Sequence, residues 1–172
     1  MAGCPVEIER KYLIAYPDTE LLRKAEGVRI WDITQTYLTS DAGVTARVRR
    51  IAEEDTVRFV YTAKRRISAL SAFEEERDLT YGEYEDLLNR ADPARMPVRK
   101  TRYKIPCGEF VWEIDVYPFW SDRAILEIEL RDEKTEAALP PFVTVLRDVS
   151  GDKRYKNASL AKSIPVDIID ME

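Results

Sequence analysis

The chain of 172 residues contains no histidine, which removes the most common general base and metal ligand of enzymes. Nucleophiles that depend on a serine–histidine or cysteine–histidine pair are therefore excluded. Only two cysteines are present, Cys4 and Cys107, without a Cys-x-x-Cys spacing, so the sequence indicates neither a disulfide framework nor a zinc site. No apolar run reaches the roughly 18 residues of a membrane helix, and the N-terminus lacks a signal-peptide pattern. We therefore expect a cytoplasmic protein with no membrane partner.

The composition is typical of one globular domain spanning residues 1–172, with no internal repeat, linker or low-complexity segment. Hydrophobic residues make up 45% of the chain and charged residues 34%, a high charged share for a compact domain. Acidic residues outnumber basic ones by 32 to 27, which gives a net charge of −5 and argues against a nucleic-acid partner. Some of this charge is therefore expected to serve a purpose other than solubility.

Alternating apolar residues and turn residues predict eight main strands, joined mostly as hairpins. The expected strands are 6–14, 28–39, 44–51, 56–66, 73–79, 98–105, 109–117 and 123–131. Helices are expected at 21–25, 81–91 and 157–164, with a helical turn within 132–139 and a short strand at 145–149. Thr80 and Glu83 have the spacing of a capping box before the second helix. The predicted fold is mainly β (α+β), a closed eight-stranded antiparallel barrel with a few flanking helices.

Most of these strands carry like charges at every second residue, which places the charges on one face. In the first strand Glu7, Glu9 and Lys11 share a face, and Val6 and Ile8 share the other. The later rows are Arg47 and Arg49; Arg58, Lys64 and Arg66; Glu74 and Glu76; Lys100, Arg102 and Lys104; Glu113 and Asp115; and Glu127 and Glu129. Such rows either face water or line an interior. Like-charged neighbours repel unless opposite charge lies between them, which favours the interior.

A charged interior requires an occupant that satisfies both signs. Clustered carboxylates suit a hard divalent cation, Mg²⁺ or Mn²⁺. Rows of arginine and lysine suit a small polyanion rich in oxygen, and guanidinium groups match phosphate best. Acidic and basic rows in one barrel therefore predict a site for a metal–polyphosphate complex.

The ordered set of motifs resembles the CYTH superfamily, the triphosphate tunnel metalloenzymes, whose fold is a closed eight-stranded antiparallel tunnel. Glu7-x-Glu9-x-Lys11 is similar to the signature of that family. The similarity continues through Gln35-Thr36-Tyr37-Leu38, Arg47-Val48-Arg49, Lys64, Glu74-Glu75-Glu76, Lys100-Thr101-Arg102-Tyr103, Trp112-Glu113-Ile114-Asp115, Glu127-Ile128-Glu129-Leu130 and the block from Gly151 to Asn157. It spans residues 7 to about 160.

The resemblance implies a role for each charged row. The implied metal ligands are Glu7, Glu9, Glu127 and Glu129. The implied substrate-binding residues are Lys11, Arg47, Arg49, Lys64, Lys100, Arg102 and Arg154, the last beside a C-terminal helix that closes one tunnel mouth. Lys11, Glu113 and Asp115 are the implied catalytic residues, with the two acids assisting a second ion or orienting the nucleophile. Glu74 and Glu76 are expected to hold the basic residues in place rather than to bind water or metal.

The activity that the resemblance implies is metal-dependent hydrolysis of inorganic tripolyphosphate to pyrophosphate and phosphate. A thiamine triphosphatase is an alternative, with Trp31, Tyr37 or Trp120 as an aromatic platform. A class IV-type adenylyl cyclase and a non-catalytic polyphosphate- or nucleotide-binding module are the others. Without histidine, the general base must be a carboxylate, a lysine or a metal-bound hydroxide. The sequence leaves a homodimer open.

Overall fold

The computed structural model describes residues 6–169. Cys4 lies outside the described residues, so the expectation for this thiol is not tested. Cys107 is a free, exposed thiol. The elements, in chain order, are β1 (Val6–Ala15), α1 (Thr19–Arg23), β2 (Arg29–Leu38), β3 (Val44–Glu53), β4 (Thr56–Arg66), β5 (Ser71–Leu79), α2 (Tyr81–Leu88), β6 (Val98–Cys107), β7 (Phe110–Val116), β8 (Arg123–Leu130), β9 (Val145–Asp148), the 3-10 helix η1 (Lys153–Tyr155) and α3 (Asn157–Leu160).

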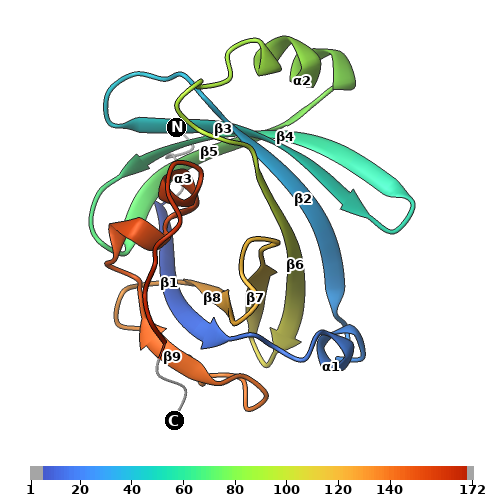
Figure 1. The fold of residues 1–172 in the computed structure, drawn as a ribbon, viewed down its shortest axis with the longest axis vertical. Helices are drawn as coiled ribbons and strands as arrows, with labels where there is room; N and C mark the ends of the chain where they lie inside the picture. Colours follow the sequence, from blue (N-terminus) through green and yellow to red (C-terminus); the bar gives the residue numbers. More distant parts are fainter. Residues whose placement is uncertain (1–5, 170–172) are drawn as a thin grey trace.

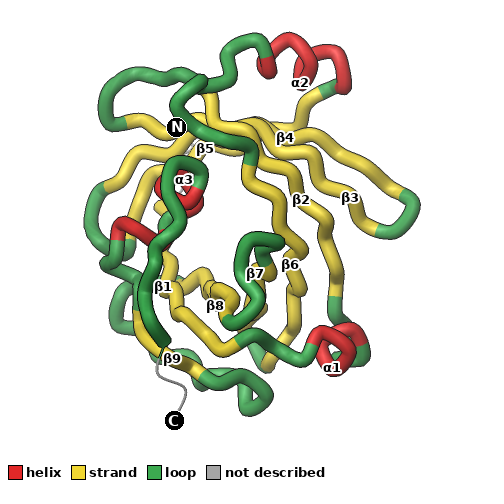
Figure 2. The backbone as a smooth tube through the Cα atoms, viewed as in Figure 1, coloured by secondary structure: helices red, strands yellow, loops and turns green. Residues whose placement is uncertain are grey.

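Eight strands form one closed antiparallel barrel (Figure 1). Their order is β5-β4-β3-β2-β6-β7-β8-β1, and β1 pairs back onto β5 to complete the ring. The strands encircle the interior in Figure 2, with α2 packed outside β2, β3 and β4. β9 pairs with β1 outside this ring. The closed eight-stranded barrel expected from the sequence is confirmed, with one strand added.

Strand β1 has three partners because its free edge is divided between β5 and β9. Val6 to Ile8 pair with β5, Tyr12 to Ile14 pair with β9, and the opposite edge pairs with β8 along most of its length. Between the two short pairings, the backbone N–H of Glu9 donates to the carbonyl of Leu70 at 3.0 Å. The N–H of Lys11 donates to the hydroxyl of Ser150 at 2.9 Å. The strand that carries the signature motif is therefore fixed from every side.

The capping box before α2 is confirmed. The N–H of Glu83 donates to Thr80 Oγ1 at 3.2 Å, and the N–H of Thr80 donates to Glu83 Oε2 at 2.7 Å. The helix ends at Leu88 rather than 91, because the next residues turn toward β2 and Asp92 N–H bonds to the carbonyl of Tyr37. Likewise, α3 ends at Leu160 rather than 164.

The helical turn expected within 132–139 is wrong. These residues form turns and extended chain, because the Asp132 carboxylate accepts the N–H of Lys134 at 2.8 Å. This side-chain bond is an alternative to the backbone bonds of a helix. Pro140 and Pro141 follow, and neither has an N–H with which to extend a helix.

Apolar clusters cover the outside of the barrel and pack against one end. One cluster lies under α1 on the outer face of β6, β7, β8 and β1, and a second lies under α2. A third cluster joins the end of β2, the start of β6 and the start of β8 to η1 and α3, and we call it the sealing cluster. Its members include Leu13, Tyr37, Trp120, Tyr155 and Leu160. Among residues 6–169, no helix combines the length and apolar composition needed to cross a membrane.

Candidate active site

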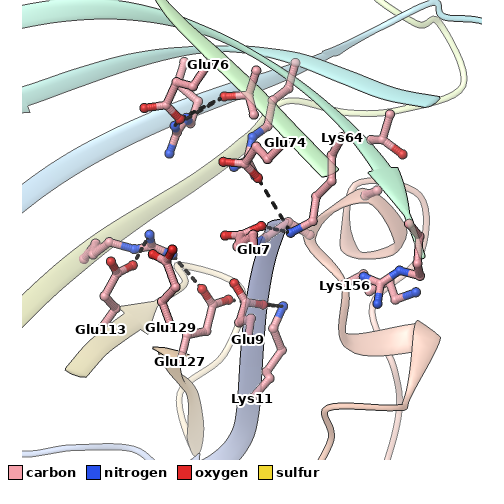
Figure 3. A pocket seen from close by; sticks show the side chains of 18 of the residues that line it. Glu7, Glu9, Lys11, Lys64, Glu74, Glu76, Glu113, Glu127, Glu129 and Lys156 are labelled. Carbon is pink, nitrogen blue, oxygen red and sulfur yellow. Dashed lines mark hydrogen bonds and ion pairs between the residues drawn. The ribbon is translucent and has the colours of Figure 1, made fainter. Parts of the chain in front are cut away.

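A cavity of about 540 Å³ occupies the barrel interior, and charged side chains make up most of its lining (Figure 3). The lining includes Glu7, Glu9, Lys11, Arg47, Arg49, Lys64, Glu74, Glu76, Arg102, Glu113, Glu127 and Glu129. These residues come from β1, β3, β4, β5, β6, β7 and β8. The like-charged rows therefore face a shared cavity rather than the surrounding solvent.

Carboxylates from three neighbouring strands form one wall of the cavity. Glu9 on β1 is the direct cross-strand partner of Glu129 on β8, and Glu113 on β7 is the partner of Glu127 on β8. Burial, the charge of Glu127 and that of Glu7 raise the pKa of Glu9 to about 7. Burial and the charge of Glu7 also raise the pKa of Glu129. This acidic wall therefore carries more negative charge than its own cations neutralise.

Lys11 lies between the acidic wall and the sealed end of the barrel. Its Nζ is 3.1 Å from Glu127 Oε1 and 3.8 Å from Glu9 Oε1, and it donates to the carbonyl of Tyr155 at 3.5 Å. Burial opposes the charge on Lys11, but the two carboxylates outweigh it and raise the pKa of the ammonium. Burial likewise opposes the charge of Glu127, while Lys11 and Arg102 hold its pKa below its usual range. Both groups are therefore ionised at neutral pH.

Cations from β3 and β4 form the opposite wall. Lys64 Nζ donates to Glu7 Oε2 at 2.5 Å and lies 3.7 Å from Glu74 Oε2. Arg49 Nη2 donates to Glu76 Oε2 at 2.6 Å, and burial with the charge of Arg47 lowers the pKa of Arg49 to about 10. Glu74 and Glu76 thus contact basic residues of this wall.

Arg47 is held by an amide instead of a carboxylate. Its Nη1 donates to Gln35 Oε1 at 3.2 Å, and Gln35 Nε2 in turn donates to the hydroxyl of Tyr37 at 2.8 Å. Gln35 is fully buried, so this amide network orients the guanidinium before any ligand arrives.

A buried ion cluster lies beneath the lining. Arg102 donates from Nε and Nη2 to the two carboxylate oxygens of Asp115, both at 2.7 Å. It also donates to Glu127 Oε2 at 2.9 Å and contacts Glu113. Lys100 Nζ donates to Asp115 Oδ2 at 2.6 Å, and burial with the charge of Arg102 lowers the pKa of Lys100 to about 8. Lys100 and Asp115 are buried and do not line the cavity, unlike the other residues of these rows.

Arg154 also lies outside the lining. Its guanidinium is half-exposed and donates to Asp152 at 2.7 Å and Asp167 at 2.9 Å. The cavity residues of this segment are instead Lys156 and Asn157. Burial and the positive charge of Arg66 lower the pKa of Lys156 to about 8.

Lys156 is not among the site residues that the sequence predicts, whereas Arg154 in the same basic run is. The neighbouring side chain of Asn157 accepts a 2.6 Å hydrogen bond from the buried hydroxyl of Tyr117. This bond fixes the segment at the sealed end of the barrel and thereby places the preceding lysine at the cavity.

The acidic wall has the chemistry of a divalent-cation site. Its donors are carboxylate oxygens, which Mg²⁺ and Mn²⁺ prefer, and the raised pKa of Glu9 marks surplus negative charge there. Within residues 6–169, no three of these groups converge closely enough to hold an ion as they stand. Glu7 and Glu127 are instead paired with Lys64 and Lys11, cations that a polyanion would attract.

Comparisons with known proteins agree with this geometry, although no family model matches the chain. The chain is 34% identical over 164 residues to an inorganic triphosphatase of Nitrosomonas europaea, covering 92% of this chain and 99% of that protein. It is 30% identical over 159 residues to an inorganic triphosphatase of Acetivibrio thermocellus, covering 91% and 94%. The crystal structure of the inorganic triphosphatase NE1496 superposes with a TM-score of 0.56 at 30% identity, covering 92% and 96%. The chain belongs to the triphosphate tunnel metalloenzymes, the CYTH family.

Proposed function

We propose that this protein hydrolyses inorganic tripolyphosphate to pyrophosphate and phosphate with Mg²⁺ or Mn²⁺. The observation that carries the proposal is the pairing of an acidic wall with a basic wall in one cavity inside the closed barrel. The two curated relatives, both inorganic triphosphatases that match nearly the whole chain, support the same activity. The cavity, at about 540 Å³, has room for a small polyanion together with a hydrated cation.

The basic wall is the proposed phosphate cradle. Arg47, Arg49 and Lys64 lie on adjacent strands, and Arg102 faces the cavity from β6. Three of these four cations are paired with glutamates across the cavity or along its wall. A triphosphate offers such cations stronger, multiply charged partners, so the ion pairs exchange and the glutamates become available to a metal.

The proposed metal ligands are Glu7, Glu9, Glu127 and Glu129, whose oxygens are the donors that Mg²⁺ and Mn²⁺ require. A bound cation supplies charge neutralisation on the phosphoryl oxygens and lowers the pKa of water. Glu7 and Glu127 are paired with Lys64 and Lys11, whereas Glu9 has another carboxylate, Glu129, as its direct cross-strand partner.

The proposed catalytic residues have different tasks. Lys11 is charged and buried, so it stabilises negative charge on the reacting phosphate rather than abstracting a proton. Glu113 lines the cavity and is placed to orient a water molecule. Asp115 has no exposed surface, and its bonds to Arg102 and Lys100 make it a positioning residue rather than a base.

Phosphate release tests the proposal directly. Purified protein is incubated with tripolyphosphate, thiamine triphosphate, ATP or long-chain polyphosphate, each with Mg²⁺, Mn²⁺ or a chelator. We expect turnover of tripolyphosphate that requires the cation and exceeds that of the other substrates. Tight binding of tripolyphosphate without any phosphate release would establish a binding module instead. Pyrophosphate and cyclic AMP formed from ATP would establish a cyclase.

A further inference from the structure

Trp31 lines the cavity at the end of the barrel opposite the sealing cluster. It lies near the start of β2, whereas Tyr37, near the end of that strand, belongs to the sealing cluster. Arg58, near the start of β4, also lines the cavity, and its side chain is 46% exposed, so solvent reaches this end. Trp31 itself is only 6% exposed. Other side chains must therefore cover the indole ring of Trp31, although it lies at an end of the barrel that solvent reaches.

Three cations cover the indole ring. Lys104 Nζ lies 4.1 Å from the ring centroid, and the guanidinium carbons of Arg58 and Arg29 lie at 5.0 Å and 5.4 Å. Lys104 and Arg58 line the cavity, whereas Arg29 does not. The ring face is thus occupied by positive charge at the position where an incoming organic group would stack.

Each of these cations is held in place by a carboxylate. Lys104 is 3.6 Å from Glu113, Arg58 is 3.6 Å from Asp78, and Arg29 is paired with Glu53. Behind the ring, Trp31 packs with Ile33, Ile51 and Val60. These three continue the inward-facing rows of β2, β3 and β4 at a period of two, so they form an apolar support inside the barrel. The ring is thus supported from behind by apolar side chains and covered by cations that each have a carboxylate partner.

The two other aromatic residues that the sequence suggests as stacking platforms, Tyr37 and Trp120, do not offer a free ring face to a substrate either. Tyr37 is the second aromatic residue among the described residues that line the cavity, and the guanidinium of Arg95 lies 5.3 Å from its ring centroid. Trp120 lies in the sealing cluster and does not line the cavity. The described part of the chain therefore offers no bare aromatic face to a substrate in this cavity.

The cations that cover the ring of Trp31 affect different classes of triphosphate differently. A nucleobase that stacks on Trp31 has to displace cations whose attraction to the ring is comparable to the stacking it gains. A thiazolium ring carries its own positive charge and meets Lys104 and Arg58 as like charges. Tripolyphosphate has a charged terminal oxygen where the organic triphosphates have their ester group, and this charge gains from both cations.

We propose that Trp31, Lys104 and Arg58 form a selectivity gate that favours an inorganic triphosphate over triphosphates bearing a nucleoside or thiamine. The gate rests on the proposed triphosphatase function and identifies the substrate class of that same cavity. Its distinctive prediction is that removing the cations uncovers a stacking surface, so that organic triphosphates become better substrates while the inorganic one does not.

The kinetic test compares Lys104→Ala, Arg58→Ala and the double variant with the wild-type protein. We expect the ratio of kcat/KM for ATP to that for tripolyphosphate to rise about tenfold in the double variant. The ratio for thiamine triphosphate rises in the same direction. Lys134→Ala, which removes an exposed lysine elsewhere, is the matched control and leaves both ratios unchanged.

Loss of two positive charges alone also changes the ratio, because the substrates differ in charge. The same substitutions are therefore repeated with Trp31→Leu, which keeps the site apolar but removes the ring. The gate requires the rise to disappear in this background. An equal rise without the indole ring, or no rise in folded cation variants, would overturn the proposal.

A binding measurement keeps this test separate from the proposed function. Equilibrium dialysis with a non-hydrolysable ATP analogue gives a dissociation constant even when nothing is hydrolysed. Tighter binding to the double variant that is lost with Trp31→Leu supports the gate. A wild-type protein that never hydrolyses tripolyphosphate would contradict the proposed function, whereas unchanged nucleotide affinity in the cation variants would contradict the gate alone.

Discussion

Glu9 and Glu129 face each other directly across the β1–β8 pair, and both side chains line the cavity. Glu129 is exposed, whereas burial and the charges of Glu127 and Glu7 raise the pKa of Glu9 and so oppose its ionisation. The barrel tolerates this arrangement at the strand that it holds most firmly, since β1 pairs with three other strands. A carboxylate held on this strand although its surroundings oppose its charge indicates a site kept for a ligand.

Replacing Glu9 separates stability from activity. In the folded protein the pKa of Glu9 is raised from 4.5 to about 7, so the folded state binds its proton more tightly than the unfolded state does. Wild-type stability therefore falls as pH rises from about 4.5 to 7, and Glu9→Gln escapes this loss. Without divalent cations at pH 8, we expect Glu9→Gln to be more stable by about 1–2 kcal/mol and inactive with Mg²⁺.

Urea unfolding of both proteins at pH 5 and pH 8 checks the stability difference, and phosphate release checks the activity. Glu109→Gln, at an exposed glutamate outside the barrel interior, serves as the control. A stability difference that is the same at both pH values would contradict the assignment of the raised pKa to Glu9.

Neighbouring arginines on β3 offer a matched test of the phosphate cradle. Arg49 lines the cavity and is buried, whereas Arg50 is exposed on the other face of the strand. We expect Arg49→Ala to lower kcat/KM for tripolyphosphate by about 10- to 100-fold, the loss of one charge-assisted contact worth about 1.5–3 kcal/mol. Arg50→Ala changes it little. Equal effects of the two substitutions, with both proteins folded, would argue against the cradle.

The lowered pKa of Lys156 leads to a prediction for how kcat/KM changes at alkaline pH. Its pKa is lowered to about 8, so it loses its positive charge in the range where the other cavity cations keep theirs. We expect kcat/KM for tripolyphosphate to fall above about pH 8 in the wild-type protein. Lys156→Arg moves this fall to higher pH, and Lys156→Ala gives a lower profile without it. A rise through pH 8 that Lys156→Ala abolishes would make this lysine the general base instead.

Asp115 forms ion pairs with two buried cations, Lys100 and Arg102. Its negative charge therefore stabilises the fold in addition to orienting Arg102. We expect Asp115→Asn to destabilise the protein by about 3–5 kcal/mol, because Lys100 and Arg102 lose their shared partner. Adding Lys100→Met recovers part of this loss by removing one unpaired charge. Urea unfolding measures both variants, and an unchanged stability of Asp115→Asn would show that the cluster is not a structural centre.

The charged rows were predictable because the period of a strand converts sequence spacing directly into a face. Glu7, Glu9 and Lys11 stand at every second residue, and the structure places all three in the cavity lining. The same rule accounts for Val60, which interrupts the polar row of β4 and packs inward against Trp31. Alternation thus identifies the inward face even where one of its residues is apolar.

Depth within the barrel was not predictable from alternation. Lys100 and Arg102 share a face of β6, yet only Arg102 reaches the cavity, because Lys100 lies nearer the sealing cluster. Position along the barrel depends on strand register and on which segments close the end. The same holds for Lys156, which a short helix places through the Asn157–Tyr117 hydrogen bond. Such long-range contacts leave no local pattern in the sequence.

The three partners of β1 also determine when the site forms during folding. Lys11 and Ser150, whose atoms meet at the divided edge of β1, are 139 residues apart in the chain. Contacts between such distant segments form late, because a long loop has to close before they contribute any free energy. We therefore expect the acidic wall, which β1 shares with β7 and β8, to assemble in the step that closes the barrel. A chain that stops short of β8 and β9 retains the signature motif but builds no site.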